Sequence, residues 1–271
     1  MLKTIKQARA ALALLNPGEV RERAGREVHV GLVASSPQKY EELEQFLAAE
    51  TSDRVHRADD PNPPATVDLV IYQHGAPNGR DAYTFDRYHP ESVVKQILDE
   101  NENLALPLAR QFPSFRKPVV DRIVRSVARE NALFAIATAL PNIAPTFFEL
   151  PWAFGEFASD TAFITGNQIR MAFLISAACG GEVGFGHQKS AMLSIIGGAF
   201  GWRAAARELA GKIPLGGGLI PKGAIAYAGT VAVGKGLEFF YCTNRKPNAS
   251  ERSEIYGKAF AQGKEATAAL R

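Results

Sequence analysis

The stretch from Asn131 to Cys242 carries too few charges to stand alone in water. Between Glu130 and Lys189 the charged side chains are Glu149, Glu156, Asp160, Arg170 and Glu182. The remainder is apolar sequence rich in Gly and Ala and interrupted by Pro. Because such a stretch offers little polar surface, it must pack against itself, a partner or a bilayer.

The lengths of the apolar runs favour a buried helical core over membrane-spanning helices. A spanning helix needs about 20 consecutive apolar residues. The run Ala132–Leu140 stops at Pro141 after nine residues, and the run Gly223–Gly234 lies between two lysines. A helical hairpin that dips into a membrane stays open, because short helices broken by proline insert when they satisfy one another.

The charge is divided unevenly along the chain. Residues 1–105 carry twelve Lys/Arg and seventeen Asp/Glu, a net charge of −5, whereas residues 106–271 carry nineteen and eleven, a net charge of +8. A basic helical half favours anionic lipid or an acidic partner. The alternative is an ordinary solvated polar face. We expect no nucleic-acid partner.

The N-terminal part of the chain predicts a small unit of alternating strands and helices. Residues 1–18 read as an amphipathic helix that is stopped by Asn16-Pro17-Gly18. Residues 27–103 then predict a reduced α/β domain with parallel strands. Its expected elements are strands at Glu27–Ala34 and Val67–Gln73 and helices at Pro37–Ala49 and about Glu91–Asn101.

Residues 104–243 predict an all-α helical domain, and residues 244–271 a tail with a short amphipathic helix. Pro118 is expected to open the first long helix. Further helices are expected at about Ser159–Gly180, Gln188–Ala210 and Lys222–Tyr241. In the last, small residues recur every fourth position and leave a flat stripe for another helix: Ala224, Ala228, Ala232 and Gly236. The expected fold class is α+β, mostly α.

Several segments of this helical half resemble a known bacterial family. They are RQFPSF from Arg110, SDTAFITGNQIRM from Ser159, GWRAAAREL from Gly201 and PLGGGLIPKGAIAYAGTVAVG from Pro214. Over about residues 104–241 the chain resembles the domain-of-unknown-function family 697, which is related to the YcjF-type inner-membrane proteins. The resemblance implies a helical domain that often follows an Era-like GTPase domain and is in some members membrane-associated. It implies no established reaction.

The first domain does not carry the motifs of an active GTPase. A P-loop, G-x-x-x-x-G-K-[ST], wraps phosphate in backbone N–H groups and holds magnesium through the final hydroxyl. From Gly31 this chain reads GLVASSPQKY, so no glycine stands directly before Lys39, and Tyr40 replaces the hydroxyl residue. No Asn-Lys-x-Asp motif follows. The position is therefore a degenerate P-loop, and Ser35, Ser36 and Lys39 are at most weak anion ligands.

Polar residues in the helical half form the main candidate site. Those on one expected helix are Asp160, Thr165, Asn167, Gln168 and Arg170. Arg203 and Arg207, four residues apart on another expected helix, are natural partners for Asp160. Buried polar groups need partners, so the set is either an internal network that fixes helix register or a ligand site. Lys222, beside a triple-glycine loop, is a further weak anion candidate.

The remaining reactive residues predict no chemistry. The histidines show no metal-ligand spacing, and there is no G-x-S-x-G motif. We expect no metal, no cofactor and no catalytic residue. The two cysteines have small or apolar neighbours and are expected to be free, buried thiols in a reducing compartment.

These patterns favour a non-enzymatic accessory or scaffold protein. Its helical domain would associate with itself, with a helical protein partner or with the inner membrane. The expected location is cytoplasmic, with peripheral or integral association at the inner membrane. The alternative is a small-ligand or anion-binding protein whose polar site lies in the helical domain.

Overall fold

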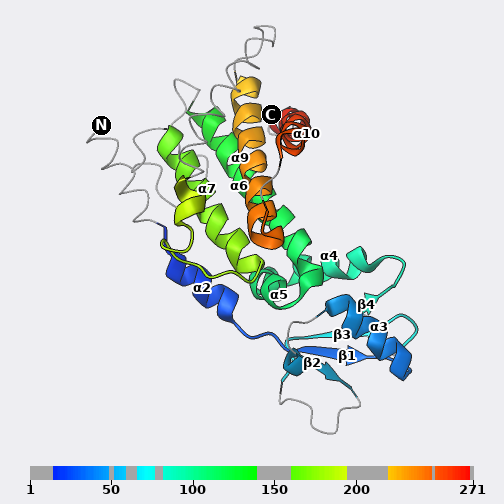
Figure 1. Cartoon of the computed structure of the whole chain (residues 1–271). Helices are drawn as coiled ribbons and strands as arrows, with labels where there is room; N and C mark the ends of the chain where they lie inside the picture. The colour runs from blue at the N-terminus through cyan, green and yellow to red at the C-terminus, as the bar shows by residue number, and fades with distance from the viewer. Residues whose placement is uncertain are drawn as a thin grey trace. The chain divides into compact units, whose positions relative to one another are not determined.

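The computed structural model describes residues 15–48, 52–58, 66–76, 82–138, 160–193, 219–245 and 248–268. These residues form two compact units (Figure 1). The α/β unit contains Glu19–Asp121 and Ala177–Gly181, and the helical unit contains the other described residues. The division falls inside one long helix, between Asp121 and Arg122.

The α/β unit is built on a small parallel sheet of four strands. The strands are β1 (Val30–Val33), β2 (Val55–Arg57), β3 (Leu69–Gln73) and β4 (Tyr83–Phe85). Their order in the sheet is β2-β1-β3-β4, and every neighbouring pair is parallel. In register, Val30 lies opposite both Val55 and Leu69. A parallel sheet with a helical half after it confirms the expected fold class, α+β and mostly α.

Short helices accompany the sheet. They are α2 (Pro17–Gly25), α3 (Pro37–Leu47), α4 (Pro90–Glu100) and α5 (Ala105–Gln111), with 3-10 turns η1 (Ser52–Arg54) and η2 (Glu102–Leu104). α3 contacts β1 and β3, and α4 contacts β4. The sheet and these helices bury a common apolar core whose members include Leu32, Leu43, Ile71 and Ile97, all fully buried. Transfer of such side chains out of water stabilises the unit by about 1.5–3 kcal/mol each.

Four long helices follow in the described part of the chain. They are α6 (Pro113–Ala137), α7 (Asp160–Ala178), α9 (Leu219–Thr243) and α10 (Ala249–Ala268). α6, α7 and α9 meet at Gly234 of α9, where a Cβ would stand 2.6 Å from Val124 of α6 and 3.2 Å from Met171 of α7. Only glycine permits this approach, so the backbone of α9 lies directly against side chains of α6 and α7.

Several local expectations need correction. Pro118 lies inside α6, which begins at Pro113, so it does not open the helix. Pro17 begins α2, so Asn16-Pro17-Gly18 is a helix start; residues 1–14 lie outside the described part. β2 and β4 were not expected from the sequence. Of the helix expected at Gln188–Ala210, the residues after 193 lie outside the described ranges.

The cysteines also need a correction. Cys179 and Cys242 are both disulfide-bonded, so the expectation of free thiols is wrong. Cys242 is also exposed rather than buried. Because disulfides persist mainly in oxidising compartments, the cysteines no longer support a reducing one.

Candidate functional site

A chain of buried amides and a hydroxyl joins the three central helices of the helical unit. Asn167 of α7 donates through Nδ2 to Oδ1 of Asn131 on α6, at 2.9 Å. Asn131 donates in turn through Nδ2 to Oγ1 of Thr230 on α9, at 2.9 Å. Thr230 donates to the carbonyl oxygen of Ala226 one turn earlier, at 2.8 Å. All three side chains are fully buried, so this ladder fixes the register of α6, α7 and α9.

A charge pair stands beside the ladder. Arg170 of α7 donates through Nη2 to Oε2 of Glu130 on α6, at 2.6 Å. The side chains keep 28% and 21% of their exposure, so the pair lies at the edge of the bundle. A pair at such an edge adds about 1 kcal/mol or less to stability. It therefore contributes mainly orientation between the two helices.

Gln168, unlike Asn167 and Arg170 on the same helix, has no hydrogen-bond partner for its side chain among the described residues. It is fully buried, and neither its Oε1 nor its Nε2 makes a hydrogen bond within the described part of the chain. The Oδ1 of Asn167 is in the same state. A buried polar group left unpaired costs about 1–3 kcal/mol. Gln168 therefore weakens the bundle in its present state, and residues that break a local rule in this way often have a functional reason.

The other predicted members are less informative. Thr165 is partly exposed on α7. Asp160 begins α7, but its side chain is not described, and Arg203 and Arg207 lie outside the described residues. The proposed pairing of Asp160 with these arginines stays a prediction. The structure instead gives Asn167 and Arg170 partners on α6.

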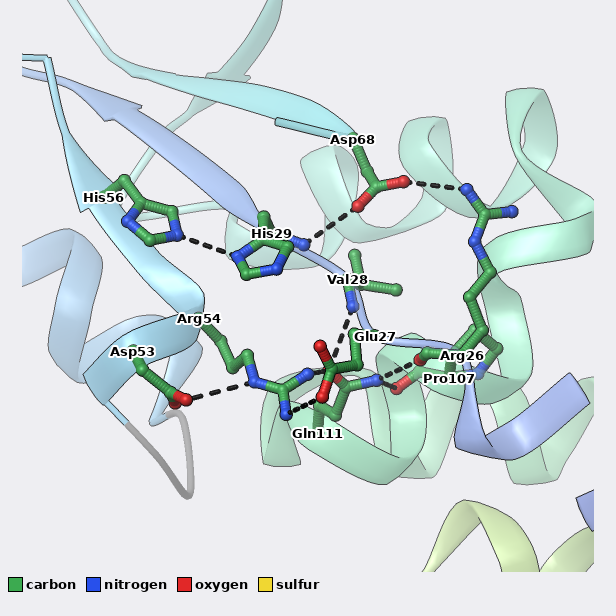
Figure 2. A network of polar contacts seen from close by, with 10 residues as sticks. All are labelled: Arg26, Glu27, Val28, His29, Asp53, Arg54, His56, Asp68, Pro107 and Gln111. Carbon is green, nitrogen blue, oxygen red and sulfur yellow. Dashed lines mark hydrogen bonds and ion pairs between the residues drawn. The ribbon is translucent and has the colours of Figure 1, made fainter. Parts of the chain in front are cut away.

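In the α/β unit the densest polar network lies at the amino ends of the strands (Figure 2). Gln111 of α5 is its centre. Its Oε1 accepts from the backbone N–H of Val28 and from Nη1 of Arg54, each at 3.1 Å. Its Nε2 donates to the carbonyl oxygens of Arg26 at 2.8 Å and Pro107 at 3.1 Å. One amide thereby ties the segment before β1, the start of β2 and helix α5 together.

A second part of this network holds two histidines against each other. The ring nitrogens Nδ1 of His29 and Nε2 of His56 lie 2.9 Å apart (Figure 2). The backbone N–H of His29 donates to Oδ2 of Asp68 at 2.9 Å, and the other oxygen of Asp68 accepts from Arg26 at 2.7 Å. The histidine pair could not be predicted from the sequence, because three residues are too few to mark β2 as a strand beside β1.

Three of the predicted anion ligands, Ser35, Ser36 and Lys39, follow β1 at the opposite, carboxyl edge of the sheet. The next strand in sequence, β2, lies on one side of β1, and β3 lies on the other side, so the order of strands reverses at this point. Ligands of open α/β sheets commonly bind at such a point. The Oγ of Ser36, however, accepts from the backbone N–H of Lys39 at 3.4 Å and so caps α3. Lys222 is exposed on α9 and belongs to the other unit.

Within the described ranges no group of three His, Cys, Asp or Glu side chains is placed to hold a metal ion. Burial raises the pKa of Tyr241 to about 12, so its hydroxyl is not poised as an acid or base near neutral pH. The arrangement is suited to holding helices and strands in register.

Comparisons of the chain with protein-family models, with curated proteins and with solved structures found no match. The resemblance to the GTPase-associated helical family therefore stays a prediction. In the described part of the chain, no helix has both the length and the apolar character needed to cross a membrane.

Sequence reasoning missed three hydrogen-bonding partners in the helical unit: the half-buried Glu130 and the buried Asn131 and Thr230. Asn131 left a detectable signal, because it interrupts an otherwise apolar series at helical spacing, Val120, Val124, Val127 and Phe134. A lone amide on the apolar face of a helix predicts a buried hydrogen-bonding partner. The partners themselves lie 36 and 99 residues away in sequence, at Asn167 and Thr230, and no local pattern reveals them.

Proposed function

We propose that this chain is a non-enzymatic accessory or scaffold protein whose helical unit associates with itself, a helical protein partner or the inner membrane. The observation that supports this most is the packing of α9. Apolar residues lie on every side of α9, beside its three charged residues Lys222, Lys235 and Glu238. Neighbouring helices approach to near-backbone distance at two glycines, Gly234 on α9 and Gly263 on α10. A helix that is apolar all round is a packing element and needs partners on every side.

The basic side chains of the helical unit favour a negatively charged surface as one of these partners. On α6, Arg125 and Arg129 are exposed one turn apart. Clustered basic side chains are attracted to anionic lipid with about 1 kcal/mol each near the membrane surface. Association at the inner membrane also agrees with what the family resemblance implies.

The two cysteines argue against the expected cytoplasmic location. Both cysteines are disulfide-bonded, and disulfides are rare in the reducing cytosol. We therefore propose association with the inner membrane surface without assigning its side.

Vesicle flotation with matched charge variants tests the membrane form of the proposal. Arg125→Glu combined with Arg129→Glu should lower the fraction of protein that floats with phosphatidylserine vesicles. The control, Arg21→Glu combined with Arg23→Glu, makes the same charge change on exposed residues of α2. Equal loss in both double variants would assign binding to net charge rather than to α6. If no variant floats and the wild type is oligomeric, the self-associating form is favoured.

A second candidate function, binding of a small polar ligand in the helical unit, is favoured by Gln168 alone. Its unpaired donor and acceptor are the groups that a neutral ligand with one carbonyl and one N–H or O–H would satisfy. Native mass spectrometry of the purified protein tests this. The ligand form predicts a small-molecule adduct that Gln168→Leu loses, and an adduct retained equally by both proteins contradicts it.

A further inference from the structure

The histidine pair places two imidazole nitrogens, both strong metal-ligating atoms, face to face. His29 immediately precedes β1, and His56 is the central residue of β2. Their facing nitrogens are 2.9 Å apart, their ring centroids 5.2 Å apart, and the rings are tilted by 30°. His56 lies opposite Gly31 in the ladder, so β1 has no Cβ at that position, and the side chains of Val67 and Val70 lie nearest to it.

Both strands are anchored close to the pair. Asp68 accepts a hydrogen bond from the backbone N–H of His29, and Arg26 donates to Asp68. One residue before β2, Arg54 donates to Gln111 at 3.1 Å and to Glu27 at 2.8 Å. Such anchoring means that a ligand bound between the rings has little backbone to order, which favours binding.

The separation of the nitrogens is closer to that of a square-planar ligand pair than to that of a tetrahedral one. Imidazole nitrogens bind zinc at about 2.0–2.1 Å, so two nitrogens 2.9 Å apart subtend roughly 90° at an ion held at that distance. A tetrahedral zinc angle would need nitrogens about 3.3 Å apart. An angle of roughly 90° is that of square-planar or tetragonal copper(II) and nickel(II), and copper(II) binds nitrogen sites most strongly among the divalent first-row ions.

We propose that His29 and His56 form a two-histidine site for a divalent transition-metal ion, copper(II) in preference to zinc, at the amino edge of the sheet. In the metal-free protein the two nitrogens share one proton in an N–H···N hydrogen bond. As the ion binds, the donor ring gives that proton to water and takes one up on its other nitrogen, so both rings stay neutral, and each ring turns to direct the lone pair of its facing nitrogen onto the ion. Water completes the coordination. This site does not depend on the association proposed for the helical unit.

The test is a titration of the full chain with copper(II) chloride near neutral pH, followed by calorimetry and by electron paramagnetic resonance. The resonance spectrum should show splitting from two nitrogen ligands. His29→Gln and His56→Gln should each weaken binding at least about tenfold, because loss of an outer-shell partner alone costs 10–100-fold. His74→Gln, an exposed histidine of the same unit outside the pair, should bind as the wild type does.

Two results would overturn the site. One is equal copper affinity in the wild type and both pair variants; the other is a loss in His74→Gln as large as theirs. Circular dichroism of each metal-free variant checks that the sheet still forms. If a pair variant does not fold, the wild-type spectrum decides alone, since one nitrogen ligand or none contradicts the proposal. Tighter binding of zinc than of copper contradicts the geometric preference.

Discussion

Gly263 of α10 lies against the backbone of Ala224 on α9, so closely that a Cβ at 263 would stand 2.7 Å from the carbonyl oxygen of Ala224. Ala224 is the first residue of the small-residue stripe that the sequence marks on α9, and Ala228 and Ala232 follow it. At this end the stripe is therefore occupied by the chain's own last helix. The flat surface predicted to accept a helix does accept one.

Gly263→Ala should separate α10 from α9. The added Cβ meets backbone rather than a flexible side chain, so the helices must move apart. Overpacking of this kind costs about 1–3 kcal/mol, which urea unfolding measures as a lower free energy of unfolding.

Gly257→Ala is the matched control on the same helix, because nothing lies within 4 Å of a Cβ at 257. There the substitution should raise stability by about 0.5–1 kcal/mol, since alanine loses less backbone entropy in a helix. The two variants should thus change stability in opposite directions. A shift of the same sign in both would show that the contact with Ala224 is not tight.

Asn131→Leu should destabilise the helical unit by about 1–3 kcal/mol. It removes the acceptor for Asn167 and so leaves that buried amide unpaired, and it removes the donor to Thr230, whose hydroxyl keeps its bond to Ala226. Thermal and urea unfolding measure the loss. Ser126→Ala, on an exposed face of the same helix, should stay within about 0.5 kcal/mol, and a similar loss in both variants would argue against a structural ladder.

Gln168→Leu should leave the free energy of unfolding unchanged or raise it by up to about 2 kcal/mol. Leucine has a similar volume, and the amide that it replaces is buried without partners in the described structure. Asn167→Leu on the same helix should be destabilising, because Asn167 donates to Asn131. If Gln168→Leu costs more than about 1 kcal/mol, its amide has partners and the ligand candidate loses its support.

Acidification should weaken the junction between α9 and α10. Glu251 accepts from Arg245 and from the backbone N–H of Asn248, each at 2.8 Å, while Asn248 accepts from the backbone N–H of Glu251 in a capping box. The hydrogen bonds from Arg245, and secondarily from the backbone of Asn248, lower the pKa of Glu251 from 4.5 to about 2. A lowered pKa stabilises the folded state above the unfolded value, and that stabilisation is lost as the pH falls from about 4.5 to about 2.

Unfolding of the wild type and of Glu251→Gln across this pH range isolates the effect. The stability advantage of the wild type should shrink toward pH 2 and be constant above about pH 5. An advantage that does not change with pH would mean that Glu251 titrates alike in the folded and unfolded chain. Because the carboxylate is exposed, the effect should also weaken at high salt.

Elements with long apolar or periodic runs were predictable, and elements defined by distant partners were not. The last long helix, expected at Lys222–Tyr241, is found as α9 because small and apolar residues make up most of it. β2 and β4 have three residues each, with sequences VHR and YTF, and carry too little pattern to be recognised. Their hydrogen bonds to β1 and β3 define them as strands.

Proline led to two wrong predictions of helix ends, at Pro17, which begins a helix, and at Pro118, which lies inside one. Pro118 was expected to begin a helix, but Pro113 does so, and Phe112 before it has an extended backbone that ends α5. Proline fits the first turn of a helix and is also tolerated further in when packing outweighs the lost hydrogen bond. In the candidate site, Asn167 and Gln168 were correctly expected to be buried and polar. Their partners and the histidine pair depend on contacts between segments far apart in sequence.

The most direct test of the central claim is flotation of the full wild-type chain with anionic vesicles, alongside size-exclusion chromatography with light scattering. The account predicts that the protein floats with phosphatidylserine vesicles or elutes as a stable oligomer, because α9 and its neighbours form an association module. A monodisperse monomer that stays with the unbound fraction would contradict it, and would leave the apolar helices as an internal core.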